Sequence, residues 1–371
     1  MSNNKKYAII SWIGVVNYGT NLQAIALYKA FSKYIKDCEV INIIFNAEKI
    51  GQIKNSLFLI KLKIENLWRK YPLCPKIRYN NTNRFIENEC ICKVVDSHSK
   101  LKKLEKEYDC FVVGSDQVWN PAYINDSYNL AFIKDKPKYS YASSIGVTEI
   151  DKDKQKYYDK LSLFKKISVR EDSAKQLLSK HLHRDNIQTV ADPTLLLGAA
   201  EWHSMSSKAN IPEQISAQSK YLLFYFVEPQ PNYLESINKI KQKYKDTPVI
   251  ILNGEIDSKN ITEGIRFDEA GPYEFLWLIE HASVICTDSF HATTISLIFN
   301  KEFWVIKRFK DEEKKSQNSR IDDLFNMLSI NRYCNNIENN ESNLDFEVIN
   351  DKLEKLKKIS ENYLTSILDH E

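Results

Sequence analysis

Two polar turns, each directly after a short apolar run, hold the residues best suited to chemistry. The first turn follows residues 111–113 and contains Asp116. The second turn follows residues 284–286 and contains His291. In α/β proteins, polar groups just beyond the carboxyl end of a buried strand commonly form the binding or catalytic site. The first turn alone fits a structural role equally well, and the second turn of the same design favours a site.

The second turn predicts an anion-binding helix N-terminus. Ser289 is a natural N-cap residue, and Thr293 lies in the first turn of the expected helix. Free backbone N–H groups and the helix dipole attract anions at such a terminus. Histidine has a reference pKa of about 6.5, so a residue of this type at position 291 can add charge or move a proton. A capped helix with a packed histidine is the alternative, and we favour the functional interpretation.

Two cationic positions also follow strand-like runs. Arg170 comes directly after residues 167–169, and arginine binds carboxylates and phosphates through two parallel hydrogen bonds. An exposed ion pair with Glu171 explains this position equally well. Lys307 follows the run 303–306 and is a candidate anion-binding residue, with a solvated pair beside Arg308 as the alternative.

The start of the chain predicts the first elements that position these residues. Residues 7–16 are nearly all apolar, which is typical of a strand buried on both faces. Residues 17–21 have turn chemistry, residues 22–31 have helical spacing, and residues 40–45 read as the next strand. This β-turn-α-β order predicts a doubly wound parallel sheet. Polar side chains at its first turn suit sugar hydroxyls or phosphate, and they also suit plain turn formation; they are Asn17, Tyr18 and Gln23.

A second α/β series begins at residue 221. Its expected strands are 221–227, 249–252, 284–286 and 303–306, and its expected helices are 233–244, 272–281 and 293–299. A polar stretch without a clear core pattern, 198–220, is expected to join the two series. We therefore predict an α/β protein with two Rossmann-like domains, 1–197 and 198–340, followed by a helical tail at 341–371.

Composition excludes several classes of protein. The 371 residues carry 52 basic and 49 acidic side chains, a near balance that does not suggest a nucleic-acid binder. The sequence contains neither the glycine pattern of a dinucleotide-binding turn nor that of a P-loop. Seven scattered cysteines, with one close pair at Cys90 and Cys92, indicate reduced thiols in the cytoplasm and no metal site. No apolar run approaches the ~18 residues of a membrane span.

A lysine-rich amphipathic helix is expected at residues 54–70. Such a helix can lie on an anionic membrane surface, where its cations meet lipid headgroups. It can also pack its apolar side on its own domain, and we favour this second interpretation.

Six segments together resemble the bacterial polysaccharide pyruvyl transferases. They occur in the family's order over roughly residues 7–310, and they are 17–24, 114–121, 141–146, 168–171, 192–194 and 287–291. One departure is Ala292, since the family usually has glycine after the histidine. Its methyl group narrows the approach of a ligand to the backbone.

The resemblance implies a glycosyltransferase-B-like fold and phosphoenolpyruvate as donor, with the donor in the second domain and the acceptor in the first. The product would be a pyruvate ketal on a sugar, and no cofactor would be needed. By this resemblance His291 is a general acid or a phosphate anchor, and Arg170 holds the donor's carboxylate or phosphate. Asp116 is a further catalytic candidate that shapes the acceptor side, with Trp119 as a stacking face. The remaining substrate-binding candidates are Ser115, Gln117, Asn253, Gly254, Phe290, Ala292, Thr293 and Lys307.

Some of the implied properties stay open at this point. The acceptor can be a free or a lipid-linked saccharide, and a lipid-linked one would bring the enzyme to the inner membrane face. Oligomeric state is also open. A nucleotide-sugar glycosyltransferase is the main alternative, with Glu280 and Asp268 as candidates for binding ribose hydroxyls. A non-catalytic glycan-binding protein is a second alternative, which the presence of Asp116, Arg170 and His291 disfavours.

Overall fold

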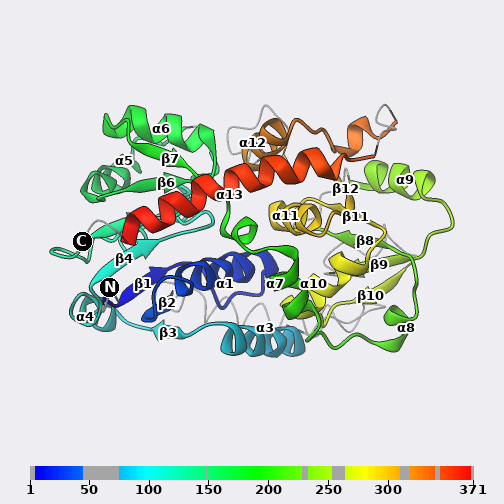
Figure 1. The fold of residues 1–371 in the computed structure, drawn as a ribbon, viewed down its shortest axis with the longest axis horizontal. Coiled ribbons are helices and arrows are strands. Elements are labelled where there is room, and N and C mark those ends of the chain that lie inside the picture. The colour runs from blue at the N-terminus through cyan, green and yellow to red at the C-terminus, as the bar shows by residue number, and fades with distance from the viewer. Residues whose placement is uncertain are drawn as a thin grey trace.

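The computed structural model describes residues 5–44, 75–147, 149–227, 233–252, 264–309, 318–338 and 343–368. Two five-stranded parallel sheets form the two ends of the molecule in Figure 1. The first sheet has the order β3-β2-β1-β4-β5. Its strands are β1 (Tyr7–Ile10), β2 (Cys38–Ile43), β3 (Cys92–Val95), β4 (Cys110–Val113) and β5 (Lys138–Ser140).

The second sheet repeats this topology, with the order β10-β9-β8-β11-β12. Its strands are β8 (Leu222–Tyr225), β9 (Val249–Leu252), β10 (Ile265–Phe267), β11 (Val284–Thr287) and β12 (Glu302–Val305). In both sheets the first strand of the series lies at the centre and the order reverses beside it. Such a reversal point, at the carboxyl ends of the strands, is where doubly wound sheets bind ligands.

A short parallel pair, β6 (Ile167–Val169) and β7 (Ile187–Thr189), continues the first sheet beyond β5. Isolated bridges join Tyr139 to Lys166 and Ser143 to Val169. This extension brings the residues after β6 and β7 to the same edge as those after β4.

Helices cover both sheets. They are α1 (Tyr18–Ser32), α3 (Pro75–Glu89), α4 (His98–Glu107), α5 (Gln155–Tyr158), α6 (Asp172–Leu182), α7 (Ala199–Ser206), α8 (Glu213–Ser216), α9 (Tyr233–Lys243), α10 (Pro272–His281), α11 (Phe290–Ile298), α12 (Ser319–Leu328) and α13 (Phe346–Leu368). Three short 3₁₀ helices are η1 (Asp159–Leu163), η2 (Pro193–Leu196) and η3 (Cys334–Asn336).

Two expectations from the sequence are corrected here. The first strand covers only Tyr7–Ile10, and the apolar side chains of Val15 and Val16 are exposed. The stretch 198–220, which has no clear core pattern in the sequence, forms α7 and α8, and Trp202 and Ile215 on these helices are buried in a cluster with residues of both domains. Its few apolar residues lie on short helices, so the pattern was too brief to recognise.

Helix α1 packs against both domains. Leu27, near its C-terminal end, joins a core of the first sheet, and Leu22 joins the core that contains Phe275 of the second domain. The ring of Tyr18 stacks on Phe275 with 4.7 Å between centroids, and its hydroxyl donates to the carbonyl of Ala270 at 2.9 Å. Helix α1 therefore contributes apolar side chains to clusters of both domains.

A buried carboxylate reinforces this junction. Glu89 of α3 pairs with Lys29 of α1 at 2.8 Å and with Lys208, just after α7, at 2.6 Å. The hydroxyl of Tyr273 in α10 donates to the same carboxylate at 2.7 Å. Burial alone would raise the pKa of Glu89, but the lysines outweigh burial and lower it. The carboxylate of Glu89 thus connects α3 with α1, with α10 and with the residue that follows α7.

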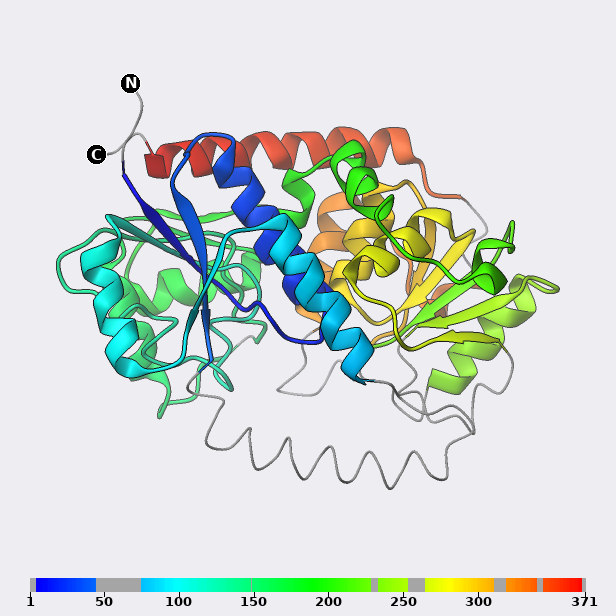
Figure 2. The same cartoon turned by 90° about the horizontal axis from the view of Figure 1, so that it is seen from below.

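The helix expected at the end of the chain is present as α13, which lies across both domains (Figure 1; Figure 2). Ile349, near its start, is buried in the second domain's core, while Leu364 is buried against the first sheet. The hydroxyl of Tyr363 donates to the carbonyl of Ser140 in β5 at 2.8 Å. In the part of the chain that is described, no helix is long and apolar enough to cross a membrane.

Candidate active site

Four chain segments converge where the two domains meet. Asp116 follows β4, Arg170 and Glu171 follow β6, Asp192 follows β7, and His291 lies in the first turn of α11. All five side chains are buried, and we call them the Arg170 cluster. The three catalytic candidates Asp116, Arg170 and His291 therefore lie in one cluster.

The turn after β4 is built to hold Asp116. Gly114 adopts φ +124°, where a side chain would run into the carbonyl of Tyr141. Gln23 of α1 accepts a hydrogen bond from the backbone N–H of Ser115 at 3.1 Å. The hydroxyl of Thr20 donates to Asp116 at 3.0 Å. Gln23, predicted to bind substrate, is thus a buried residue that positions this turn.

Arg170 is the centre of the cluster. Its Nη1 donates to Asp192 Oδ2 at 2.7 Å, and its Nη2 lies 3.5 Å from Asp116 Oδ1. The guanidinium group lies over the ring of Phe290, 4.6 Å from its centroid. Burial alone would lower the pKa of Arg170, but Asp192 and Asp116 outweigh burial and raise it. Arg170 is therefore a fixed, permanently charged group.

Asp192 is a site residue that the sequence analysis did not select. Its Oδ1 accepts hydrogen bonds from the backbone N–H and the hydroxyl of Thr194, at 3.0 and 2.7 Å. Its Oδ2 lies 3.6 Å from His291 Nε2. Burial alone would raise the pKa of Asp192, but His291 and Arg170 hold it well below its usual range. The position after β7 was a signal, since three other site segments also follow strands.

The pKa of Asp116 is lowered as well. Burial would raise the pKa of its carboxyl group, and the charges of His291 and Arg170 outweigh burial and lower it. An ionised Asp116 can accept a hydrogen bond or a proton from a hydroxyl group, as a general base must.

Glu171 accepts hydrogen bonds from the backbone of the loop after β5. Its Oε1 accepts hydrogen bonds from the hydroxyl of Ser144 and from the N–H groups of Ile145 and Gly146, at 2.8, 2.9 and 3.1 Å. Its Oε2 faces Arg170 Nε at 3.9 Å. The exposed ion pair considered as an alternative for Arg170 and Glu171 is therefore wrong, because both side chains are buried.

The N-terminus of α11 carries His291 as expected. Ser289 is the N-cap residue, and its side chain accepts from the N–H of Ala292 at 3.3 Å. The hydroxyl of Thr293 donates back to the carbonyl of Ser289 at 2.9 Å, so Thr293 stabilises the helix start. The guanidinium group of Arg170 stacks over the Phe290 ring. This terminus combines N–H groups, a histidine and an arginine, which suits a small anion.

Gly19 makes room for the histidine ring. A Cβ atom built on Gly19, in the first turn of α1, would overlap the ring of His291. The N-termini of α1 and α11 therefore approach each other as closely as they do only because position 19 has no side chain.

Replacing Gly19 with alanine is expected to lower turnover by about 10²-fold, since a displacement of ~1 Å has an effect of this size. The added methyl group must displace the His291 ring from its present position beside Asp192. Gly198→Ala is the matched control, because a Cβ there would meet only Glu201 Oε2 at 3.7 Å. Steady-state rates of the two variants test this, and a fully active Gly19→Ala enzyme would contradict it.

Several predicted ligand-facing residues have other surroundings. Trp119 is fully buried, packs edge-on against Phe164 and donates its indole N–H to the carbonyl of Tyr128 at 3.0 Å, so it presents no stacking face for a sugar. Tyr18 is buried in the domain junction. Asn17 is the N-cap of α1, and its side chain accepts from Thr20 N at 3.2 Å.

Two more candidates, Ser115 and Gln117, lie in the turn after β4. Ser115 donates to the carbonyl of Ala142 at 3.0 Å and lies 3.3 Å from Asp192. Gln117 is buried beside Gly146. Asn253 and Gly254 lie outside the described residues, as do 54–70.

The cation after β12 that faces the site is Arg308. Lys307 turns away, toward the ring of Tyr333 at 4.8 Å and Asp322 at 3.9 Å. Arg308 lies 3.3 Å from Asp288, which also accepts the N–H of Val227 at 2.7 Å. The sequence did not distinguish the two neighbours, because their directions depend on how α12 covers the sheet.

The ribose-binding candidates of the alternative hypothesis are engaged elsewhere. Glu280 accepts hydrogen bonds from Ser206 and lies 2.6 Å from His203, both on α7. Asp268 lies 3.5 Å from Arg266. Glu280 thus helps to fasten α7 to α10.

Buried donors of the Arg170 cluster point to a ligand. Among the described residues, Arg170 Nε and Nη2 and His291 Nε2 have no hydrogen-bond partner. Buried N–H groups without a partner cost about 1–3 kcal/mol each, so proteins rarely keep them without a function. An anion placed between Arg170 and His291 would satisfy them.

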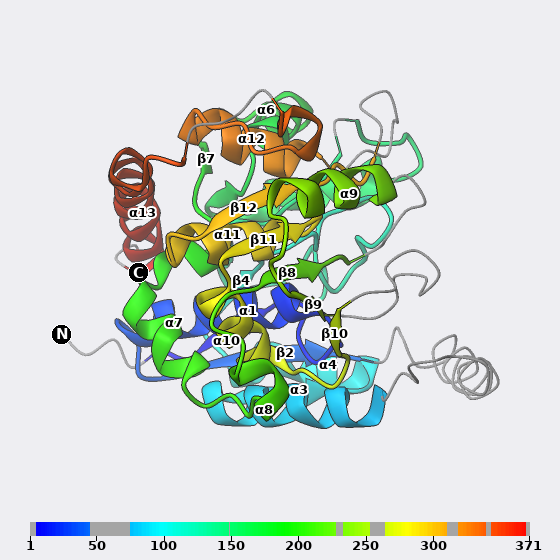
Figure 3. The same ribbon diagram turned by 90° about the vertical axis from the view of Figure 1, so that its right-hand side faces the viewer.

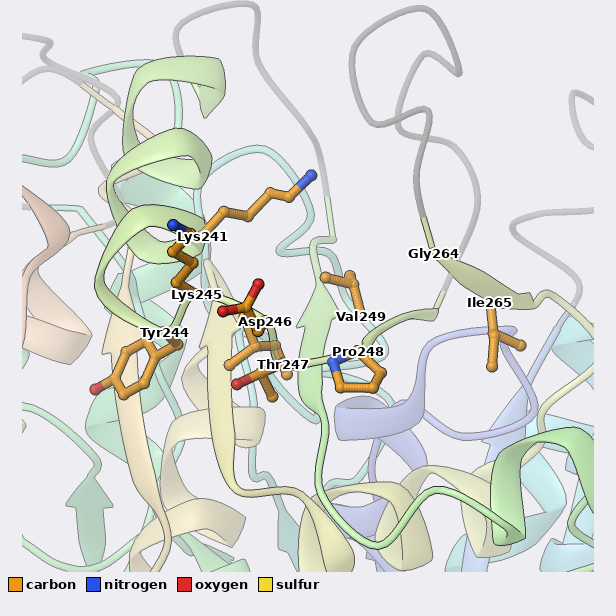
Figure 4. Close-up of a pocket in the computed structure, with 10 residues that line it drawn as sticks. Lys241, Tyr244, Lys245, Asp246, Thr247, Pro248, Val249, Gly264 and Ile265 are labelled. Atoms are coloured by element: carbon orange, nitrogen blue, oxygen red, sulfur yellow. The ribbon is translucent and has the colours of Figure 1, made fainter.

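One cavity lies away from this cluster. It measures about 570 Å³ and is bounded by Lys241, Asp246, Val249 and Ile265 (Figure 4). These residues surround the amino ends of β8–β10, the edge opposite to the site. A second cavity, of about 390 Å³, reaches Arg170 and Asp192. No cluster of potential metal ligands occurs within the part of the chain that is described.

Two Rossmann-like domains with matching sheet topology and a C-terminal helix that crosses both define a protein with the glycosyltransferase-B fold. The chain belongs to the polysaccharide pyruvyl transferase family, whose model matches residues 17–308. The family and the fold class expected from the sequence are thus confirmed. No curated protein matches the sequence.

Solved structures with a similar fold are distant in sequence. MnaA of S. aureus, solved with UDP, has a TM-score of 0.53 and 13% identity over 97% of this chain and 89% of that one. HepE of Anabaena, in complex with UDP, has a TM-score of 0.50 and 10% identity over 98% and 99% of the two chains. UDP-GlcNAc 2-epimerase from Neisseria meningitidis has a TM-score of 0.49 and 14% identity over 94% and 100%. At such identity the likeness concerns the fold alone.

Proposed function

We propose that this enzyme transfers pyruvate from phosphoenolpyruvate to a sugar of a surface or exopolysaccharide repeat unit, forming a pyruvate ketal and releasing phosphate. The observation that carries the proposal is a set of buried nitrogen atoms of Arg170 and His291 beside the N-terminus of α11. In the described part of the chain they have carboxylate neighbours at 3.5–3.9 Å but no hydrogen-bond partner. Phosphoenolpyruvate is a small trianion, and such a group of N–H donors is the environment that it requires.

The reaction needs a proton at the methylene carbon of the donor. Protonation makes C3 a methyl group and leaves C2 with oxocarbenium character. A sugar hydroxyl then attacks C2, the bond from C2 to the phosphate oxygen breaks, and the second hydroxyl closes the ketal. Of the two hydroxyl protons, one balances the proton taken up by the methyl group, and the other leaves on phosphate. A general acid, a base and anchors for both anionic groups are required.

The residues of the cluster can fill these roles. His291 Nε2 is a donor that can deliver the proton, with Asp192 as its counter-charge at 3.6 Å. Arg170 holds the carboxylate or phosphate of the donor. Asp116, kept ionised by His291 and Arg170, accepts a proton from an acceptor hydroxyl. We place the reaction in the cytoplasm, where phosphoenolpyruvate is available.

Thermal unfolding with ligands tests the proposal. Millimolar phosphoenolpyruvate is expected to stabilise the protein, by ~2.7 kcal/mol at 100 times its dissociation constant. Release of inorganic phosphate with saccharide acceptors would then demonstrate transfer. Stabilisation by nucleotide sugars, with none by phosphoenolpyruvate, would refute the proposal and favour a glycosyltransferase.

A further inference from the structure

Arg320 lies beside the Arg170 cluster although it is outside the residues that the family model matches. It occupies the first turn of α12, whose start is fixed on two sides. Asn318 donates to the carbonyl of Phe309, after β12, at 2.7 Å. Asp323 accepts from the hydroxyl of Ser173 in α6 at 3.2 Å. Figure 3 shows α12 next to α6, so Arg320 is held from both domains.

Arg320 and Arg170 share one aromatic ring. The guanidinium carbon of Arg170 lies 4.6 Å from the centroid of Phe290, and that of Arg320 lies 6.0 Å from it. Phe290 is itself the first residue of α11. Two guanidinium groups are therefore brought together at the helix N-terminus that already attracts anions.

Burial and neighbouring cations disfavour the charged form of Arg320. Burial and the nearby charge of Arg170 lower the pKa of Arg320 to about 10, and Arg308 acts in the same direction. Asp116 and Glu171 oppose this shift without reversing it. Like charges are normally kept apart in a partly buried site unless a ligand of opposite charge binds between them.

The cavity of about 390 Å³ reaches these groups from the surface. Arg170, Asp192, Phe290 and Arg320 form its inner end. Apolar side chains of η2, α12 and α13 form its sides; they include Leu195, Leu324 and Leu356. Its volume lies in the usual range for small-molecule sites, about 300–1,000 Å³. A small organic anion can therefore reach both arginines.

We infer that Arg320 is a substrate-binding residue, which with Arg170 forms a two-guanidinium site for the anionic groups of the donor at the inner end of this cavity. The inference rests on the proposed function for the identity of the donor. One arginine binds the carboxylate and the other the phosphate, so phosphoenolpyruvate engages both where inorganic phosphate or pyruvate engages one.

Arg332 supplies a matched control in the same domain. It is a buried arginine that forms an ion pair with Glu302 at 3.0 Å and lies over Trp304 at 4.9 Å. Arg332→Gln removes a structural arginine, so it is expected to lower the melting temperature of the free protein and to leave the shift by phosphoenolpyruvate unchanged.

Arg320→Gln is expected to lose the response that Arg332→Gln keeps. The shift in melting temperature by phosphoenolpyruvate should be smaller than in the wild type, because one of the two anion-binding groups is removed. The KM of the variant for phosphoenolpyruvate should rise about 10- to 100-fold, the effect of losing hydrogen bonds to a charged group, with a smaller change in kcat. Arg320→Lys should recover part of the affinity, since it restores charge without the two-pronged geometry.

The outcomes separate this inference from the proposed function. If phosphoenolpyruvate stabilises the wild type and Arg320→Gln equally, the inference is overturned. If phosphoenolpyruvate fails on the wild type, the proposed donor is wrong. A stabilisation by inorganic phosphate that Arg320→Gln abolishes would still support the anion site, and no effect of phosphate, pyruvate or phosphoenolpyruvate would overturn it.

Discussion

Replacing His291 with glutamine is expected to lower turnover by about 10²–10⁴-fold while the protein stays folded. Loss of a positioned general acid has an effect of this size. Glutamine keeps an N–H donor near Asp192, but it cannot release a proton. The measurement is phosphate release from phosphoenolpyruvate with a saccharide acceptor, followed over pH in both proteins. The limb of the pH profile that reports the acid should disappear in the variant.

The kinetic pattern distinguishes the two roles of His291. An acid affects kcat and kcat/KM together, whereas an anchor for phosphate raises KM with little change in kcat. His203→Gln is the control, because His203 is an exposed residue of α7 that faces Glu280. Near-normal rates for His291→Gln would show that another group protonates the donor.

Arg170→Met is expected to abolish phosphoenolpyruvate binding and to lower the free energy of unfolding by about 3–5 kcal/mol. Removing one partner of a buried ion pair leaves the other charge uncompensated, and losses of this size result. Here the carboxylates of Asp192 and Asp116 lose the guanidinium that lies 2.7 and 3.5 Å away. Lys100→Met, which breaks an exposed pair with Asp96, should change stability very little.

The pH dependence of this loss has a definite sign. The folded-state pKa values of Asp192 and Asp116 are lowered, so their stabilising interaction with Arg170 is complete above the unfolded value of about 3.9. It is lost as pH falls through the folded values. The difference in stability between wild type and Arg170→Met should therefore be large at neutral pH and narrow below pH ~4. Denaturant unfolding at several pH values measures it, and a gap that widens in acid would contradict it.

The fold was predictable because its elements have strong periodic signals. Strands such as β4 and β11 are continuous apolar runs that end at polar turns, and the turns carry Asp116 and His291. Carboxyl ends of parallel strands meet at one edge, so the gathering of Asp116 with Arg170 followed from the topology of the first sheet. His291 belongs to the second sheet and meets them through the packing of the two domains. The family resemblance then identified the class.

The site predictions that were wrong or missing concern residues whose surroundings depend on contacts between distant segments. Trp119 and Tyr18 have the residue types of a sugar-binding surface, and only packing against Phe164 and Phe275 shows that they are buried. Asp192 looks like a turn residue until η2 is placed against α11. Arg320 has no local signal at all, because its role depends on α12 bridging the two domains.

Helix α13 determines when the first domain can finish folding during synthesis. The core of the first sheet contains Tyr7 and Val112, but also Tyr363, Leu364 and Ile367. The hydroxyl of Ser360 accepts the N–H of Ala191 at 2.8 Å. On the ribosome, the first domain cannot complete this core, which covers one face of its sheet, until the whole second domain and α13 have been synthesised. The two domains are therefore expected to mature together, and a nascent chain that stops short of α13 leaves apolar surface exposed to chaperones.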